Sequence, residues 1–285
     1  MLLGGSYLRC IALLVITLFW SGSALCAPPQ PPGRIVSLAP AMTEMLYAMG
    51  LGNRVVGVSN ACDRPAEVST KPKVGGMPNP SLEAILALKP DVVVMTREGN
   101  PKSIADRLTK LGKKIYVFKA SRLSELPAGI REMGQALGAH DAAEGMAHNI
   151  ENAMAEASFR RQKRPKAERK ALFVIWPKPL IVAGGTTIIN DAMKVNGLTN
   201  IAADTTVAYP HYSVEAVMQH QPDLIIIGAA HDPDMKRQSK DMMKHLGMLN
   251  AVRKGHVCYV GDALYRPGSR IAEGLAELKQ CEALQ

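Results

Sequence analysis

The sequence predicts an α/β protein built from two similar lobes that are joined by one long helix. The main observation is an internal repeat: residues 81–95 (SLEAILALKPDVVVM) and 213–227 (SVEAVMQHQPDLIII) share Ser-x-Glu-Ala, a helical turn, Pro-Asp and an apolar run. The second observation is a stretch between the copies, residues 123–162, that is helical and nearly free of strand signal. Solenoid repeats recur every ~20–50 residues, so copies this far apart indicate two lobes instead.

The N-terminal end of the chain has the features of a secretory signal peptide, which we assign to residues 1–26. A basic residue precedes an apolar run at residues 11–20, and small residues follow up to a predicted cut after Cys26. The apolar run is about half the ~20 residues that cross a bilayer, which argues against a membrane anchor. A lipoprotein cut before Cys26 is the other interpretation, but Leu25 is unfavourable just ahead of such a cut. Residues 27–33 (APPQPPG) are expected to form a proline-rich linker.

Composition excludes some functions and leaves the redox state open. Of the 285 residues, 47% are hydrophobic and 21% are charged, which suits a globular protein with one or two cores. The formal net charge is +9, but Lys and Arg are scattered outside residues 160–169, so no nucleic-acid partner is expected. Cys62, Cys258 and Cys281 remain after the predicted cut, without metal-site spacing. A Cys258–Cys281 disulfide and three separate thiols are both compatible with this pattern.

The first lobe, residues 34–138, is predicted to alternate strands and helices around a mostly parallel sheet. Strands are expected at residues 34–38, 55–58, 92–95 and 115–118, and a helix is expected at residues 102–111. Thr43 is predicted to cap the helix after the first strand. In the repeat, Ser81 is predicted to cap a helix with Glu83 in its positive first turn, and Pro90 to end that helix.

The connecting helix is assigned to residues 139–165. An amphipathic helix at residues 123–137 precedes it and ends at Gly138. Asp141 is predicted to cap the connecting helix, and Pro165 to stop it. One apolar stripe is expected along this helix, made by Met146, Ile150, Met154 and Phe159.

The second lobe, residues 166–285, is predicted to repeat the first. Strands are expected at residues 170–176, 224–227 and 257–260, and helices at 188–196, 235–246 and 271–281. Ser213, Glu215 and Pro222 take the places of the cap, the first-turn acid and the helix stop of the first copy. The Gly-Gly-Thr at residues 184–186 lacks the frame of a phosphate loop, which favours a turn and a helix cap.

Signatures of enzymes are scarce in this chain. GxSxG, HExxH and a strand-associated GxGxxG are all missing, and no two histidines stand three or four residues apart on one helix. An exported metal-dependent enzyme with His211 and His231 as ligands stays as the alternative from another class. Ligands of open α/β folds bind beyond the carboxyl ends of the strands, so we expect a binding protein with its site between the lobes.

Several motifs resemble one known family. RIVSLAP, RVVGVS, KVGG, SLEAILALKPDVVV and the closing RPGSRI are similar to the substrate-binding proteins of ABC importers for iron complexes, haem and vitamin B12. The corrinoid-binding branch resembles this chain most. The resemblance implies the class III, helical-backbone fold, with two Rossmann-like lobes joined by a single long α-helix. It also implies a periplasmic monomer that is no enzyme, has no resident cofactor, and carries cobalamin or a related corrinoid to the permease dimer of an ABC importer.

The resemblance also implies site residues. Glu83 and Glu215 would meet arginines of the permease. The ligand cleft would be lined by Ala39, Pro40, Ala61, Cys62, Asp63, Met77, Thr96, Arg97, Glu98, Gly99, Trp176, Tyr209, Leu264, Tyr265 and Arg266. Ala61, Met77, Thr96 and Ala263 stand where corrinoid binders of this family carry aromatic residues, which leaves Trp176, Tyr209, Tyr212 and Tyr265 to cover the macrocycle.

Two alternatives to a corrinoid carrier for an importer remain open, one for the ligand and one for its delivery. Arg97 and Arg266 are suited to amide carbonyls or the phosphate of a corrinoid, but equally to haem propionates or a ferric siderophore. In a haem or siderophore binder, Tyr209, His211 or Tyr212 would reach the iron. A corrinoid scavenger without an importer is the remaining alternative.

Overall fold

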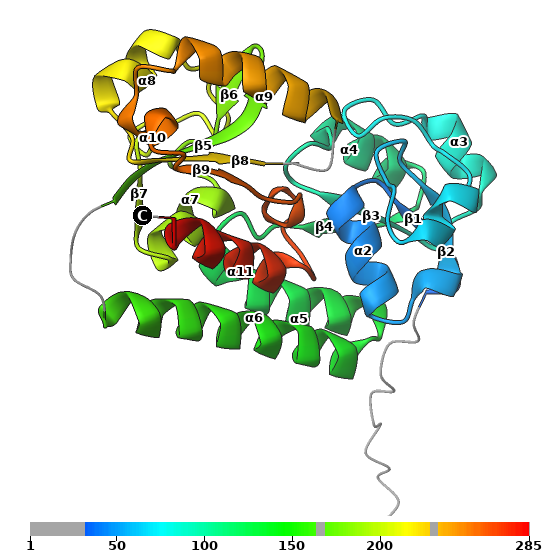
Figure 1. The fold of residues 1–285 in the computed structure, drawn as a ribbon. Coiled ribbons are helices and arrows are strands. Elements are labelled where there is room, and N and C mark those ends of the chain that lie inside the picture. The colour runs from blue at the N-terminus through cyan, green and yellow to red at the C-terminus, as the bar shows by residue number, and fades with distance from the viewer. Residues whose placement is uncertain (1–31, 164–168, 229–232, 285) are drawn as a thin grey trace, which may run out of the picture. The chain divides into compact units, whose positions relative to one another are not determined.

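The first lobe is built on a parallel four-stranded sheet. The computed structural model describes residues 32–163, 169–228 and 233–284, and residues 31–285 form one compact unit. The strand order is β2-β1-β3-β4, and every pair is parallel (Figure 1). The elements are β1 (Ile35–Ser37), α2 (Pro40–Ala48), η1 (Gly52–Arg54), β2 (Val55–Val58), η2 (Ala66–Thr70), α3 (Leu82–Ala87), β3 (Val92–Thr96), α4 (Lys102–Lys110), β4 (Lys114–Phe118) and η3 (Leu123–Glu125).

The second lobe has a mixed sheet in the order β6-β5-β8-β9, with β7 paired to β5 as well. The β5–β6 hairpin is antiparallel and the other pairs are parallel, so the prediction of a mostly parallel sheet is confirmed. The elements are β5 (Arg169–Pro177), β6 (Leu180–Val182), α7 (Ile188–Val195), β7 (Leu198–Asn200), α8 (Val214–His220), β8 (Leu224–Ile227), α9 (Pro233–His245), α10 (Asn250–Arg253), β9 (Val257–Tyr259), η4 (Ala263–Tyr265) and α11 (Ile271–Glu282).

The two copies of the repeat have the same local structure. Ser81 caps α3 by accepting the amide of Ala84 at 3.2 Å, and Ser213 caps α8 by accepting the amide of Ala216 at 3.0 Å. Both predicted caps are therefore confirmed. Each helix ends before its proline, through a residue with a left-handed backbone, Lys89 (φ 47°) or Gln221 (φ 48°).

The aspartate after each proline fixes the first strand of its own lobe. Asp91 Oδ2 accepts the amide of Arg34 at 2.8 Å, and Asp223 Oδ2 accepts the amide of Lys170 at 3.0 Å. The two lobes thus repeat a three-dimensional contact as well as a sequence motif.

Two predicted helix caps are wrong. α2 begins at Pro40, whose missing N–H and fixed φ suit the first helical position, so Thr43 lies inside the helix. The Thr43 hydroxyl is buried and donates to Ser37 Oγ at 2.8 Å. α6 (His140–Gln162) follows Ala139, and Asp141 lies in its first turn, where a carboxylate still favours the helix dipole. Pro165, the predicted stop, lies outside the described residues.

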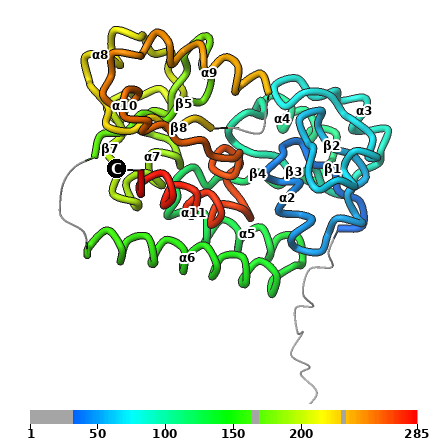
Figure 2. The backbone as a smooth tube through the Cα atoms, viewed as in Figure 1, coloured from blue at the N-terminus to red at the C-terminus, as the bar shows by residue number. Residues whose placement is uncertain are grey.

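The connecting helix α6 packs against helices of both lobes. α5 (Leu126–Leu137) and α11 both pack on α6, and α11 also contacts α7 (Figures 1 and 2). Of the predicted stripe, Ile150 is buried and Met146 and Met154 pack against the core, but Phe159 is 56% exposed. The disulfide Cys258–Cys281 links β9 to α11, which settles the pairing that the sequence left open.

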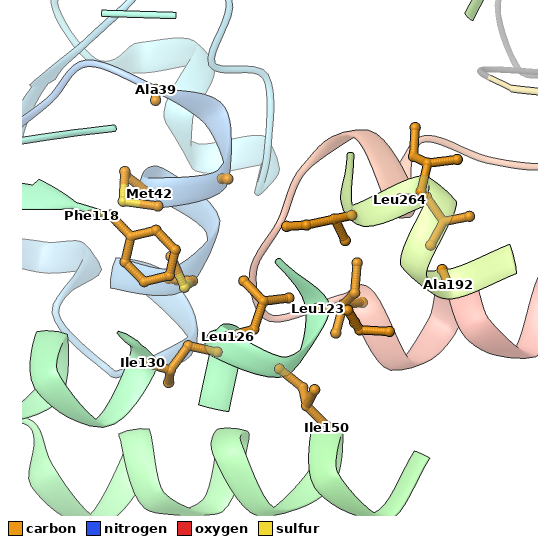
Figure 3. Close-up of a cluster of buried hydrophobic side chains, with 14 of the residues drawn as sticks. Ala39, Met42, Phe118, Leu123, Leu126, Ile130, Ile150, Ala192 and Leu264 are labelled. Carbon is orange, nitrogen blue, oxygen red and sulfur yellow. The ribbon is translucent and has the colours of Figure 1, made fainter. Parts of the chain in front are cut away.

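One hydrophobic core continues through both lobes. It contains Met42 and Phe118 of the first lobe, Leu126 of α5, Ile150 of the connecting helix α6, and Leu264 of the second lobe (Figure 3). None of the helices in the described parts of the chain has the length and apolar character needed to cross a membrane.

Candidate binding site

A cavity of about 340 Å³ lies between the two lobes. Its first-lobe wall follows the carboxyl ends of β1, β3 and β4, at residues 39–41, 96–99 and 118–120, together with Met77. Its second-lobe wall consists of Ile188, Tyr209 and residues 264–267. Strand ends are where ligands of open α/β sheets bind, because backbone groups and loops are free there to face a crevice.

Eleven of the predicted ligand-binding residues line this cavity, although their role in binding stays a prediction. They are Ala39, Pro40, Met77, Thr96, Arg97, Glu98, Gly99, Tyr209, Leu264, Tyr265 and Arg266.

The other four predicted residues lie elsewhere. Cys62 is 2% exposed, and its sulfur lies 3.1 Å from the hydroxyls of both Ser59 and Thr43, so it faces the protein interior. Ala61 is exposed outside the cavity lining. Asp63 pairs with an arginine, as described below. Trp176 is 37% exposed near the end of β5 and also lies outside the lining.

The prediction missed six lining residues. Phe118, Lys119 and Ala120 lie at the end of β4. The strand-end rule that identified the loop after β3 would have found these residues too, because β3 and β4 are parallel neighbours. Of the remaining three, Ala41 and Pro267 directly follow the predicted residues Pro40 and Arg266, and Ile188 is the first residue of α7.

Two tyrosines form the aromatic part of the wall. Tyr265 donates its hydroxyl to Val174 O at 3.3 Å and meets the ring of Phe173 edge-on at 5.9 Å between centroids. Burial raises the pKa of Tyr265 above its usual value. A Cβ at Gly228 would lie 1.6 Å from the Tyr265 hydroxyl, so only glycine fits there. Tyr209 is 42% exposed, and burial of its phenol together with Glu98 raises its pKa to about 12.

Asn100 holds three segments of the first-lobe wall together. Its Nδ2 donates to Leu38 O at 3.2 Å and to Met77 O at 3.0 Å, and its Oδ1 accepts the amide of Thr96 at 3.0 Å. This buried side chain therefore fixes the ends of β1 and β3 and the Met77 loop relative to one another.

An ion cluster joins the lobes at the edge of the cavity. Arg266 Nη1 donates to Glu44 Oε1 at 2.7 Å, and its Nη2 donates to Asp63 Oδ2 at 3.0 Å. Arg270 Nε donates to Glu44 Oε2 at 2.7 Å, and its Nη2 lies 3.0 Å from Asp262 Oδ1. Glu44 and Asp63 belong to the first lobe and the other three residues to the second.

The cluster changes the interpretation of Arg266. Its guanidinium faces three carboxylates, so the predicted pairing with a ligand phosphate or propionate does not fit this arrangement. The hydrogen bond from Arg266 lowers the pKa of Asp63. Burial opposes ionisation of Asp262, but Arg266, Arg270 and Arg64 lower its pKa nonetheless. The carboxylates are thus held in their charged form.

A second polar bridge connects the segment just before α5 with α7 of the second lobe. The Arg122 guanidinium pairs with Asp191 of α7 and donates to Gly185 O at 3.3 Å. The amide of Leu123 donates to Asp191 Oδ2 at 3.2 Å. The lobes are therefore tied at two separate places.

The residues proposed as iron ligands do not converge on the cavity. Tyr212 donates its hydroxyl to Ile201 O at 3.3 Å, and His211 lies in a bridge with Ile181 outside the cavity lining. Of the three proposed iron ligands only Tyr209 lines the cavity. His231 lies outside the described residues. Within the parts of the chain that the structure describes, no group of three or more His, Cys, Asp or Glu could hold a metal ion.

The two glutamates predicted to meet a permease are exposed on different lobes. Glu83 lies in the first turn of α3 and Glu215 in the first turn of α8 (Figure 1). The Glu215 backbone amide and the Ser213 side chain lower the pKa of Glu215.

Comparison with known proteins gives consistent matches over most of the chain. A sequence profile described as periplasmic binding protein matches residues 35–264. The vitamin B12-binding protein of Pectobacterium atrosepticum is 32% identical over 263 residues, which cover 91% of this chain and 94% of that protein. The structure of the vitamin B12-binding protein BtuF of Vibrio cholerae superposes with a TM-score of 0.75 at 27% identity, covering 89% of this chain and 97% of BtuF. The heme-binding protein RhuT of Roseiflexus gives a TM-score of 0.78 at 25% identity, covering 88% and 99%.

Proposed function

Because the chain belongs to the periplasmic binding protein family, we propose that it captures a corrinoid, cobalamin in the first place, and delivers it to an ABC importer. Its fold is that of the class III proteins of this family, as the sequence predicted. One observation carries the proposal: the cavity lies between the lobes, at the strand ends of the first lobe, and is lined mainly by apolar and aromatic side chains. Such a lining suits the wide apolar surface of a corrin ring, and relatives at 28–32% identity are named vitamin B12-binding proteins.

The corrinoid is proposed as cargo. The relatives are binding proteins, and we assign no catalytic step and no resident cofactor to this chain. Met77 and Tyr209 approach the cavity from opposite lobes, and both side chains can cover a flat ring without forming a covalent bond.

Haem is the second candidate, because the Tyr209 phenol lines the cavity and heme-binding proteins share the fold. Calorimetric titration with cyanocobalamin, haemin and a ferric siderophore tests the choice. We expect heat and a spectral shift with cyanocobalamin. A protein that responds to haemin or the siderophore but to no corrinoid would disprove the proposed ligand.

The Tyr209→Phe variant separates the two uses of this ring. If Tyr209 covers a corrinoid, phenylalanine keeps the contact area and affinity should change by less than about threefold. If the phenol oxygen binds haem iron, phenylalanine removes the ligand, and the haem absorption spectrum should change. Tyr209→Ala should weaken binding in both cases.

For delivery, we propose that Glu83 and Glu215 dock on arginines of the permease. The Glu83→Lys/Glu215→Lys variant should abolish uptake of a labelled corrinoid by cells while its affinity in solution stays unchanged. Glu132→Lys, at an exposed position of α5, is the control for the Glu83→Lys and Glu215→Lys single variants, because each reverses one charge, and it should leave uptake intact. Unimpaired uptake with the double variant would favour a scavenger without an importer.

We further propose that the protein is exported as a periplasmic monomer after removal of residues 1–26, which lie outside the described residues. Mass spectrometry of the secreted protein should find Ala27 as the first residue. A lipid-modified Cys26 would replace this proposal by a membrane-anchored lipoprotein.

A further inference from the structure

Two cationic side chains stand next to each other on the first-lobe wall of the cavity. Arg97 follows β3 and Lys119 follows β4, and both residues are exposed and line the cavity. The strands are parallel and pair Thr96 with Phe118, so the two following residues continue the same register. The amide of Arg97 donates to Phe118 O at 3.0 Å, which holds the two strand ends together at this point.

Neither Arg97 nor Lys119 forms an ion pair within the described residues, although the carboxylates of Glu98 and Glu125 lie nearby. Glu125 is influenced by Arg97 through space, but its carboxylate already accepts the amides of Ser121 and Arg122. Among the lining residues that the structure describes, Glu98 is the single carboxylate, and its charge acts on Tyr209 across the cavity.

The third cation of the lining differs from these two. Arg266 is surrounded by Glu44, Asp63 and Asp262, so its charge is matched inside the protein. Among the described lining residues of the first lobe, Arg97 and Lys119 outnumber Glu98 by one, so the lining itself carries one surplus positive charge, and Glu125 acts on Arg97 from outside it. An uncompensated cation in a concave site raises the local concentration of anions and strengthens charge-assisted hydrogen bonds to them.

We infer that Arg97 and Lys119 form a subsite for anionic oxygens of the transported ligand, and that the protein selects corrinoids that carry such a group. The inference rests on the proposed function. The oxygens could belong to the phosphodiester of a complete corrinoid or to a carboxylate of an incompletely amidated one. Arginine offers a planar pair of donors to either group, and lysine adds a compact charge.

Three corrinoids separate these sources. Cyanocobalamin carries the phosphodiester, cobyric acid carries a free carboxylate, and dicyanocobinamide carries neither. Calorimetry would compare them on the wild-type protein, on Arg97→Gln/Lys119→Gln, and on the control Arg107→Gln/Lys110→Gln. The control removes the same charge from exposed positions of α4 that lie outside the cavity lining.

We expect the Arg97→Gln/Lys119→Gln variant to bind the anionic corrinoids about tenfold more weakly, while its affinity for dicyanocobinamide and the affinities of the control stay unchanged. A loss confined to cyanocobalamin identifies the phosphate as the partner, and a loss confined to cobyric acid identifies the carboxylate. The preference of the wild type for anionic corrinoids should also shrink at high salt.

Two results would overturn the inference while leaving the proposed function intact. One is equal affinity of the variant and the wild type for all three corrinoids, and the other is an equal loss for all three. If the wild type binds none of the corrinoids, the proposed function itself fails and the subsite fails with it.

Discussion

Replacing Glu44 by glutamine tests whether the ion cluster holds the two lobes together. The Glu44 side chain is 7% exposed, and it accepts hydrogen bonds from Arg266 Nη1 at 2.7 Å and Arg270 Nε at 2.7 Å. Both arginines come from the second lobe, on either side of the turn into α11. Glutamine keeps the shape and one oxygen but removes the charge, so the arginines lose the carboxylate that they share.

The expected cost follows from how buried the cluster is. Removing one partner of a fully buried ion pair costs about 3–5 kcal/mol, and a hydrogen bond to a charged group contributes ~1.5–3 kcal/mol. Arg266 and Arg270 remain 17% and 20% exposed, and each keeps Asp262 as a partner, at 3.3 and 3.0 Å. The value should therefore lie at the lower end, about 2 kcal/mol of unfolding free energy, which lowers the Tm by roughly 4–8 °C.

Urea unfolding and calorimetry of Glu44→Gln at pH 7 give this free energy and the Tm. Glu273→Gln is the matched control, because its carboxylate also faces Arg270 but lies 3.8 Å away and is 56% exposed. The control should change stability by less than about 0.5 kcal/mol. Adding Arg270→Gln to Glu44→Gln should cost less than the sum of the single changes. A Tm for Glu44→Gln equal to that of the control would refute the reasoning.

Three other predictions concern the second lobe. Cys258→Ser/Cys281→Ser opens a disulfide of sequence separation 23 and should lower stability by about 3 kcal/mol; dithiothreitol should lower the Tm of the wild type to that of the variant. Burial raises the pKa of Glu277, so the stability of the wild type falls as pH rises through the titration of this carboxyl. In thermal unfolding, Glu277→Gln should therefore be more stable than the wild type at pH 7 but equal to it below pH ~4. Gly228→Ala should displace Tyr265, lower stability by about 1–3 kcal/mol and weaken corrinoid binding by calorimetry; normal affinity would show that Tyr265 does not shape the site.

The fold could be predicted because the repeat depends on local chemistry. A serine cap and a following apolar strand are encoded within fifteen residues, and the structure has both in each lobe. The two wrong caps, Thr43 and Asp141, have a common cause: each lies inside a helix that starts earlier than its polar side chain suggests. For α2 the proline at the first helical position was the stronger signal.

The site could be predicted only in part. Residues at strand ends can be predicted from the order of the strands along the chain. Thr96 and Arg97, at the end of β3 on the wall opposite Tyr209, are examples. The partners of Arg266 do not, because Glu44 precedes it by 222 residues and no local pattern records a contact between the lobes. The same limit explains Cys62: it lies in a polar turn of the sequence, but Thr43 of α2 and Ser59 lie against its buried sulfur.

The core and the ion pairs together determine how this protein can respond to a ligand. Both walls of the cavity are attached to one continuous core, and the lobes are tied again through Glu44 at one place and Asp191 at another. Opening the cavity widely would break charge-assisted contacts and expose apolar surface, so we expect a corrinoid to place one part in the cavity of about 340 Å³ and the rest at its mouth, with little lobe movement. Less binding energy is then spent on rearrangement. It also follows that Glu83 and Glu215 keep nearly the same separation with and without ligand. A permease that binds both glutamates would therefore have to distinguish the loaded from the empty protein by contacts at the edge of the cavity.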